Sequence, residues 1–133
     1  MSTALLDTSA LISAVDTGVV RELPFSLLTI SSLTYAELRL GLVTARGTDA
    51  LKHRSRRLVD IAQHFGPGIP FDDDCAREYE RITQTAVGLG QRPRANTLDR
   101  MIAATALTHR MPILTRNPAD LRGLGDLLEV IAV

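Results

Sequence analysis

The feature that most limits the fold of this chain is the alternation of short apolar segments with longer segments of helical periodicity. The apolar segments have the length of strands and occupy residues 3–7, 26–31, 112–115 and 127–133. Apolar side chains recur at helical spacing in most of the sequence between them, at residues 8–15, 34–46, 49–65, 73–90 and 96–110. Short buried strands alternating with helices are typical of a mainly parallel sheet covered by helices. We therefore expect an α/β fold, a three-layer α/β/α sandwich.

Length and composition are those of one globular domain spanning residues 1–133. The chain is 45% hydrophobic and 23% charged, and no linker divides it. Fifteen basic and fifteen acidic residues cancel, so the net charge points to no class of partner. The single cysteine, Cys75, excludes an internal disulfide. No segment has the roughly 20 apolar residues that span a membrane, and the N-terminus lacks a signal-peptide pattern. We expect a cytoplasmic protein that does not contact membranes.

Four acidic residues stand where predicted strands end or predicted helices begin. Asp7 ends the first strand, Asp120 follows the strand at 112–115, and Glu37 and Asp99 lie near the starts of two helices. Each has a structural alternative as part of a helix cap. Asp7 precedes a helix, and the other three acids follow a capping residue by three positions, in the pairs Thr34–Glu37, Asn96–Asp99 and Asn117–Asp120.

Taken together, the four acids favour a metal site over simple capping. The carboxyl ends of parallel strands share one edge of the sheet, which is where ligands bind in such folds. Carboxylates gathered there repel one another unless a cation lies between them. Oxygen ligands suit Mg²⁺ or Mn²⁺, and two such ions can activate a water and stabilise the leaving oxygen of a phosphodiester. We therefore expect Asp7 to bind metal as well as to stand at a helix start.

Other acid-dependent enzymes and nucleotide-binding proteins fit the sequence less well. A haloacid-dehalogenase-type phosphatase needs a second Asp two positions after the first, where this chain has Ser9. A phosphotransfer receiver needs a lysine near a late strand, and the only lysine is Lys52. The glycine patterns that bind dinucleotides or nucleoside triphosphates are absent, so no nucleotide cofactor is expected. The remaining alternative is a non-catalytic binding module that pairs with a protein or an RNA.

Four segments of the sequence resemble the signature segments of PIN-domain proteins, specifically the VapC-type toxins of bacterial toxin–antitoxin pairs. These segments are LLDTSAL, SLTYAEL, LDRMIAATAL and ILTRNPADL, and they follow one another in the family's order over essentially the whole chain. The resemblance implies a PIN fold and an endoribonuclease that depends on Mg²⁺ or Mn²⁺. It also implies an RNA substrate, a homodimer and inhibition by a cognate VapB-like antitoxin.

The resemblance also implies which residues form the site. Asp7, Glu37 and Asp99 match the three central acidic positions of the family. For the fourth position two alternatives remain, because some relatives carry an acid where this chain has Asn117 and others carry it three residues later, at Asp120. The family often has small hydroxyl residues bordering the site, and the matching positions here are Thr8, Ser9 and Thr115.

Overall fold

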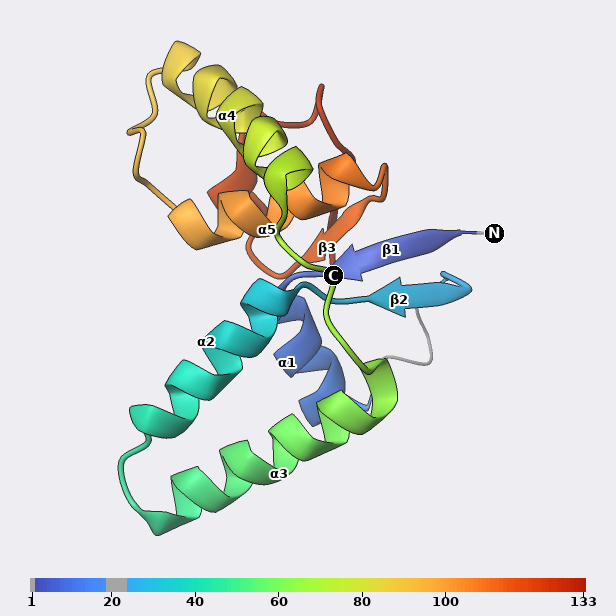
Figure 1. Cartoon of the computed structure of the whole chain (residues 1–133), viewed down its shortest axis with the longest axis vertical. Coiled ribbons are helices and arrows are strands. Elements are labelled where there is room, and N and C mark those ends of the chain that lie inside the picture. Colours follow the sequence, from blue (N-terminus) through green and yellow to red (C-terminus); the bar gives the residue numbers. More distant parts are fainter. Residues whose placement is uncertain (1, 19–23) are drawn as a thin grey trace.

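A four-stranded parallel sheet forms the centre of the protein (Figure 1). The computed structural model describes residues 2–18 and 24–133. Within them the strands lie in the order β2-β1-β3-β4, and every neighbouring pair is parallel. Their bounds are Thr3–Leu6 for β1, Leu27–Thr29 for β2, Ile113–Thr115 for β3 and Val130–Ala132 for β4. Because the strands are parallel, all four carboxyl ends share one edge of the sheet.

Five α-helices and one 3-10 helix accompany this sheet in the described part of the chain. They are α1 (Thr8–Thr17), α2 (Ser32–Val43), α3 (Thr48–Phe65), α4 (Asp73–Gly88), α5 (Thr97–Thr108) and the 3-10 helix η2 (Pro118–Leu121). Each of the five α-helices overlaps a segment where the sequence predicted a helix. The expected last strand was too long, however, because residues 127–129 precede β4 and Leu128 is buried against the core outside the sheet.

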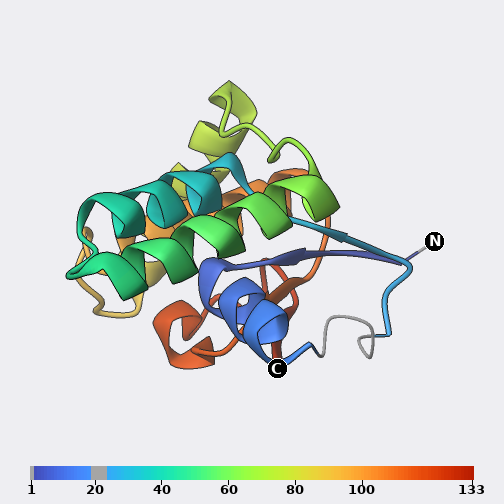
Figure 2. The ribbon, with the colours of Figure 1, turned by 90° about the horizontal axis from the view of Figure 1, so that it is seen from below.

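Alternate residues of β1 face two separate cores, which confirms the predicted three-layer α/β/α sandwich. Leu5 packs in one cluster with residues of α4 and α5, such as Ile82 and Ile102. Its neighbours Ala4 and Leu6 pack in a second cluster with residues of α1, α2 and α3. Figure 1 shows α4 and α5 on one side of the sheet and α1, α2 and α3 on the other, and Figure 2 gives the view from below, from the side of α1, α2 and α3. All three β1 side chains are fully buried, as expected for a central strand.

The glycine-rich loop that follows α3 fixes the start of α2 beside β2. Ser32 donates its backbone N–H to the carbonyl of Ile69 at 2.9 Å, and Ile69 donates to Ile30 at 2.9 Å. A Cβ atom on Gly68 would lie 2.5 Å from the backbone nitrogen of Ser32, so only glycine permits this approach. In addition, the Tyr35 hydroxyl donates to the carbonyl of Gly66 at 2.5 Å. The first turns of α2 are therefore held by this loop at two points.

None of the helices that the structure describes is long and apolar enough to cross a membrane.

Candidate active site at the carboxyl edge of the sheet

Asp7 connects the end of β1 to the start of α1. Its carboxylate accepts hydrogen bonds from the backbone N–H of Ala10 and the hydroxyl of Ser9, both at 2.8 Å. Asp7 therefore caps α1, as one interpretation of the sequence predicted. Ser9 in turn accepts the backbone N–H of Arg116 at 3.2 Å, just after β3. The ends of two neighbouring strands are thus joined at Asp7, a buried residue that is only 5% exposed.

Glu37 has no capping role, contrary to the capping-box interpretation of Thr34 and Glu37. Helix α2 begins two residues before Thr34, and its cap is Ser31, whose side chain accepts from the N–H of Leu33. Glu37 consequently lies in the second turn. Its Oε1 lies 2.5 Å from the hydroxyl oxygen of Thr8, which is also 3.0 Å from that of Thr34. A hydroxyl bridge therefore links the start of α1 to Glu37.

Asp99 lies in the first turn of α5 and Asp120 in the first turn of η2. In both helices the side chain of the preceding N-cap residue makes no capping hydrogen bond. Asn96 stands at the start of α5 in the left-handed conformation, with φ at 51°, and makes no side-chain cap bond. Its amide instead donates to the backbone carbonyl of Asp120 at 3.3 Å. Asn117 likewise makes no side-chain cap bond to η2. The two segments that carry these acids are thus held together by Asn96.

The four acids form one electrostatic unit centred on Asp99. Burial, followed by the charges of Asp120, Glu37 and Asp7 in that order, raises the pKa of Asp99 to about 6. Repulsion of this kind is the expected result when carboxylates from several elements share one edge of a sheet. The charge of Asp99 therefore responds to each of the other three acids that the sequence singled out.

Asp120 contributes to this unit, whereas Asn117 does not. Asp120 is half-buried and is the charge with the largest effect on the pKa of Asp99. Asn117 is exposed, and its backbone N–H donates to the hydroxyl of Thr115 at 3.0 Å. Of the two alternatives for the fourth position, the electrostatics favours Asp120, and this choice stays a prediction.

The carboxylates do not form a compact ligand set as they stand. Within residues 2–18 and 24–133, no three His, Cys, Asp or Glu side chains come close enough together to hold a metal ion. The chemistry of the donors nevertheless fits a hard divalent cation, because all four are carboxylates and because burial, together with the charges of the other three, raises the pKa of Asp99. Metal binding by these residues stays a prediction.

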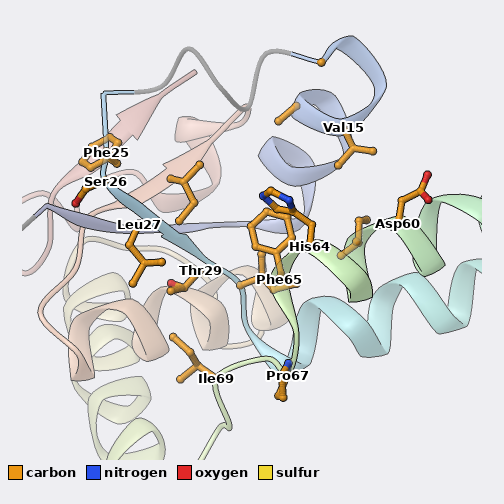
Figure 3. Close-up of a pocket in the computed structure, with 15 residues that line it drawn as sticks. Val15, Phe25, Ser26, Leu27, Thr29, Asp60, His64, Phe65, Pro67 and Ile69 are labelled. Atoms are coloured by element: carbon orange, nitrogen blue, oxygen red, sulfur yellow. The ribbon is translucent and has the colours of Figure 1, made fainter.

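A separate hollow of about 630 Å³ lies away from these acids, between β2, α1 and α3 (Figure 3). Its walls are mainly apolar, with side chains such as Val15, Phe25 and Phe65, and its ionisable side chains are Asp60 and His64. Since none of the four acids lines it, we assign it no part in the chemistry of the carboxyl edge.

Comparison with known proteins identifies the family of this chain. A model of the PIN domain matches residues 4–124. Ribonuclease VapC5 of Mycobacterium tuberculosis is 34% identical over 117 residues, which cover 85% of this chain and 82% of that protein. A crystal structure of VapBC-5, a member of the VapBC family of toxin–antitoxin systems from the same species, has 30% identity and a TM-score of 0.80 over 100% of both chains. The crystal structure of FitAcB from Neisseria gonorrhoeae has 28% identity and a TM-score of 0.78 over 96% of each chain. The chain therefore belongs to the PIN-domain family, and within it to the VapC type.

Proposed function

We propose that this protein is a metal-dependent endoribonuclease, the toxin of a toxin–antitoxin pair. The observation that carries the proposal is the group of four acids at the carboxyl edge, of which three have no capping role that would explain their position. Burial and the charges of the other three acids disfavour the ionised form of Asp99 unless a cation offsets them, so the arrangement makes sense as a binding site. The similarity to a VapC ribonuclease supports RNA as the substrate.

In this proposal Asp7, Glu37, Asp99 and Asp120 hold Mg²⁺ or Mn²⁺. When bound, such a cation lowers the pKa of water and stabilises charge on a phosphodiester. The chain itself supplies rigidity and orientation. Asp7 is fixed by Ala10 and Ser9, and Glu37 is oriented by the Thr8 hydroxyl. Above a pH of about 6 the Asp99 carboxyl gives up its proton and becomes a competent oxygen ligand.

The proposed chemistry specifies the products. Attack by water on phosphorus leaves a 5′-phosphate and a 3′-hydroxyl, because the ribose 2′-oxygen does not act as the nucleophile. In contrast, a ribonuclease that uses a pair of histidines produces a 2′,3′-cyclic phosphate. The four-acid unit contains no histidine, which favours the hydrolytic route.

We further propose that the protein acts in the cytoplasm as a homodimer and is inhibited by a VapB-like antitoxin, with residues 1–133 as one domain. Support for the antitoxin comes from the structural neighbours, which are members of VapBC and FitAcB assemblies. A test of this part is co-expression: growth arrest by the protein alone, and its relief by the protein encoded next to it, would support a toxin–antitoxin pair. Harmless expression of a folded and active protein would contradict it.

The direct test of the enzyme is incubation of purified protein with total cellular RNA, with Mn²⁺ or with a chelator, followed by mapping of new ends. We expect cleavage with Mn²⁺ only, with 5′-phosphate and 3′-hydroxyl ends, and no cleavage by Asp99→Asn. A protein that binds RNA equally well in chelator and never cleaves it would be a binding module. Cyclic phosphate ends would refute hydrolysis by water.

A further inference from the structure

Arg100 is a buried cation that has no acidic partner in the described part of the chain. It lies in the first turn of α5, directly after Asp99, and is 1% exposed. Its guanidinium donates to the backbone carbonyls of Arg92 at 2.8 Å and Pro93 at 3.3 Å, and to the side-chain oxygen of Gln91 at 3.0 Å. Burial of an arginine costs free energy unless hydrogen bonds replace water. Here those bonds go to the loop between α4 and α5.

Gln91 extends this connection to the segment that follows η2. While its oxygen accepts from Arg100, its amide nitrogen donates to the backbone carbonyl of Arg122 at 2.8 Å. Figure 1 shows the α4–α5 loop, in yellow to orange, running to the start of α5. One buried guanidinium and one amide thus hold together the α4–α5 loop, the start of α5 and the end of η2. The last two of these segments carry Asp99 and Asp120.

The segments held in this way present three exposed arginines, Arg92, Arg94 and Arg122. Within residues 2–18 and 24–133 none of the three forms an ion pair. By contrast, the exposed arginines of α4 are paired, Arg77 with Asp74 and Arg81 with Glu78. The positive charges on the α4–α5 loop and directly after η2 are therefore unpaired among the described residues, whereas those on α4 are neutralised by ion pairs.

We propose that Arg92, Arg94 and Arg122 form a rim that binds the RNA backbone beside the carboxylates, and that Arg100 and Gln91 are positioning residues that hold this rim. The inference rests on the proposed function. A group of four acids repels phosphate, so a chain with no net charge needs local cations to hold a polyanion there. Arginine suits this role because its planar guanidinium binds phosphate oxygens in pairs.

The first experiment measures binding alone. Affinity for a fluorescent single-stranded RNA is determined by anisotropy in chelator, at several salt concentrations, for Arg92→Gln/Arg94→Gln and for Arg122→Gln. We expect the double variant to bind on the order of tenfold more weakly, with a salt slope smaller by about 0.7 for each phosphate that it no longer binds. The matched control, Arg77→Gln/Arg81→Gln, removes the same charge from α4 and should change affinity little. Equally weakened binding in the two double variants would overturn the rim.

A second variant tests the positioning role with every charge kept. Gln91→Leu removes the bridge between Arg100 and Arg122. We expect its RNA affinity to fall several-fold. Its salt slope should be smaller than that of the parent protein, because the arginines no longer act together. Unchanged affinity in a folded Gln91→Leu protein would refute the positioning role.

Hydrolysis of a small phosphodiester, bis(p-nitrophenyl) phosphate, with Mn²⁺ separates the rim from the catalytic site. The substrate is too short to reach both, so Arg92→Gln/Arg94→Gln and Arg122→Gln should raise KM for RNA much more than KM for the small substrate, whereas the control Arg77→Gln/Arg81→Gln should change neither. An equal rise of KM for the two substrates would show that the rim arginines act through the acids and would overturn the inference. If the parent hydrolyses neither substrate, the proposed function fails, whereas the binding measurement still decides whether the rim exists.

Discussion

Asp99→Asn should stabilise the metal-free protein at neutral pH while it abolishes cleavage. Burial and three neighbouring acids raise the pKa of Asp99 from its usual 3.8 to about 6. Such a change corresponds to about 3 kcal/mol between the two protonation states. Asp99 is only half-buried, and screening by solvent reduces the expected gain to about 1 kcal/mol. For a domain of this size, that gain raises Tm by about 4 °C.

The pH dependence of this gain follows from linkage. The folded state holds the Asp99 proton up to a pH of about 6, whereas the unfolded state releases it near 3.8. Between these values the folded state binds more protons, so the stability of the parent protein falls as the pH rises through this window. The destabilisation is complete above a pH of about 6 and absent below about 3.8. Asparagine carries no charge at any pH, so the advantage of Asp99→Asn should disappear in acid.

The measurement is thermal unfolding of both proteins in chelator and low salt, at about pH 7.5 and about pH 4.5, where linkage predicts a large and a small difference. Asp126→Asn, an exchange of an exposed acid outside the site, serves as the matched control and should show no pH-dependent difference. Mn²⁺ should raise the Tm of the parent more than that of Asp99→Asn. A lower Tm for Asp99→Asn at neutral pH, or a gain that persists unchanged in acid, would refute the electrostatic reasoning.

Substitutions at three further positions test how the acids and the start of α2 are held. Asp7→Asn should keep the cap of α1 and the Tm within about 1 °C, whereas Asp7→Ala should destabilise the fold by about 1 kcal/mol. Neither variant should cleave RNA. Equal Tm values for the two variants would contradict the capping role of Asp7. Thr8→Val should slow cleavage about tenfold by releasing Glu37, whereas Thr8→Ser should keep the parent's cleavage rate. An unchanged rate in Thr8→Val would show that the hydroxyl is dispensable. Gly68→Ala should lower stability by about 2–3 kcal/mol because its Cβ would lie 2.5 Å from the backbone of Ser32. A neutral result in denaturant unfolding would show that the loop moves away freely.

The sequence predicted the fold well because its strands and helices have different periods of hydrophobicity. Leu5 is a clear case, since it stands in a short apolar run and is fully buried in a central strand. The end of the chain misled the same reasoning. Leu127 and Leu128 extend an apolar run that looks like a strand, but both contribute to the core from a turn before β4. Burial alone does not tell a strand from a turn packed on the core.

The start of α2 could not be predicted from local signals alone. Ser31 and Thr34 are both good capping residues, and Thr34 has a glutamate in the capping-box position. The structure selects Ser31 because Ser32 bonds to the distant Ile69 and packs against Gly68. Arg100 shows a similar limit. An arginine within a helix suggests an exposed position. Arg100 is buried instead, because backbone carbonyls of the α4–α5 loop accept its hydrogen bonds in place of water, and the sequence does not specify the path of that loop.

For Asp7, capping and catalysis are compatible, although the sequence presents them as alternatives. A carboxylate has about four lone-pair sites, and the bonds from Ala10 and Ser9 both use the same oxygen, Oδ1. Capping therefore leaves Oδ2 available and also fixes its direction, because the carboxylate is buried and held from two sides. The other three acids differ, since their helices begin with other caps or with caps that do not bond. Helix formation thus explains where Asp7 points, but it does not explain the positions of Glu37, Asp99 and Asp120, for which we propose a shared ligand.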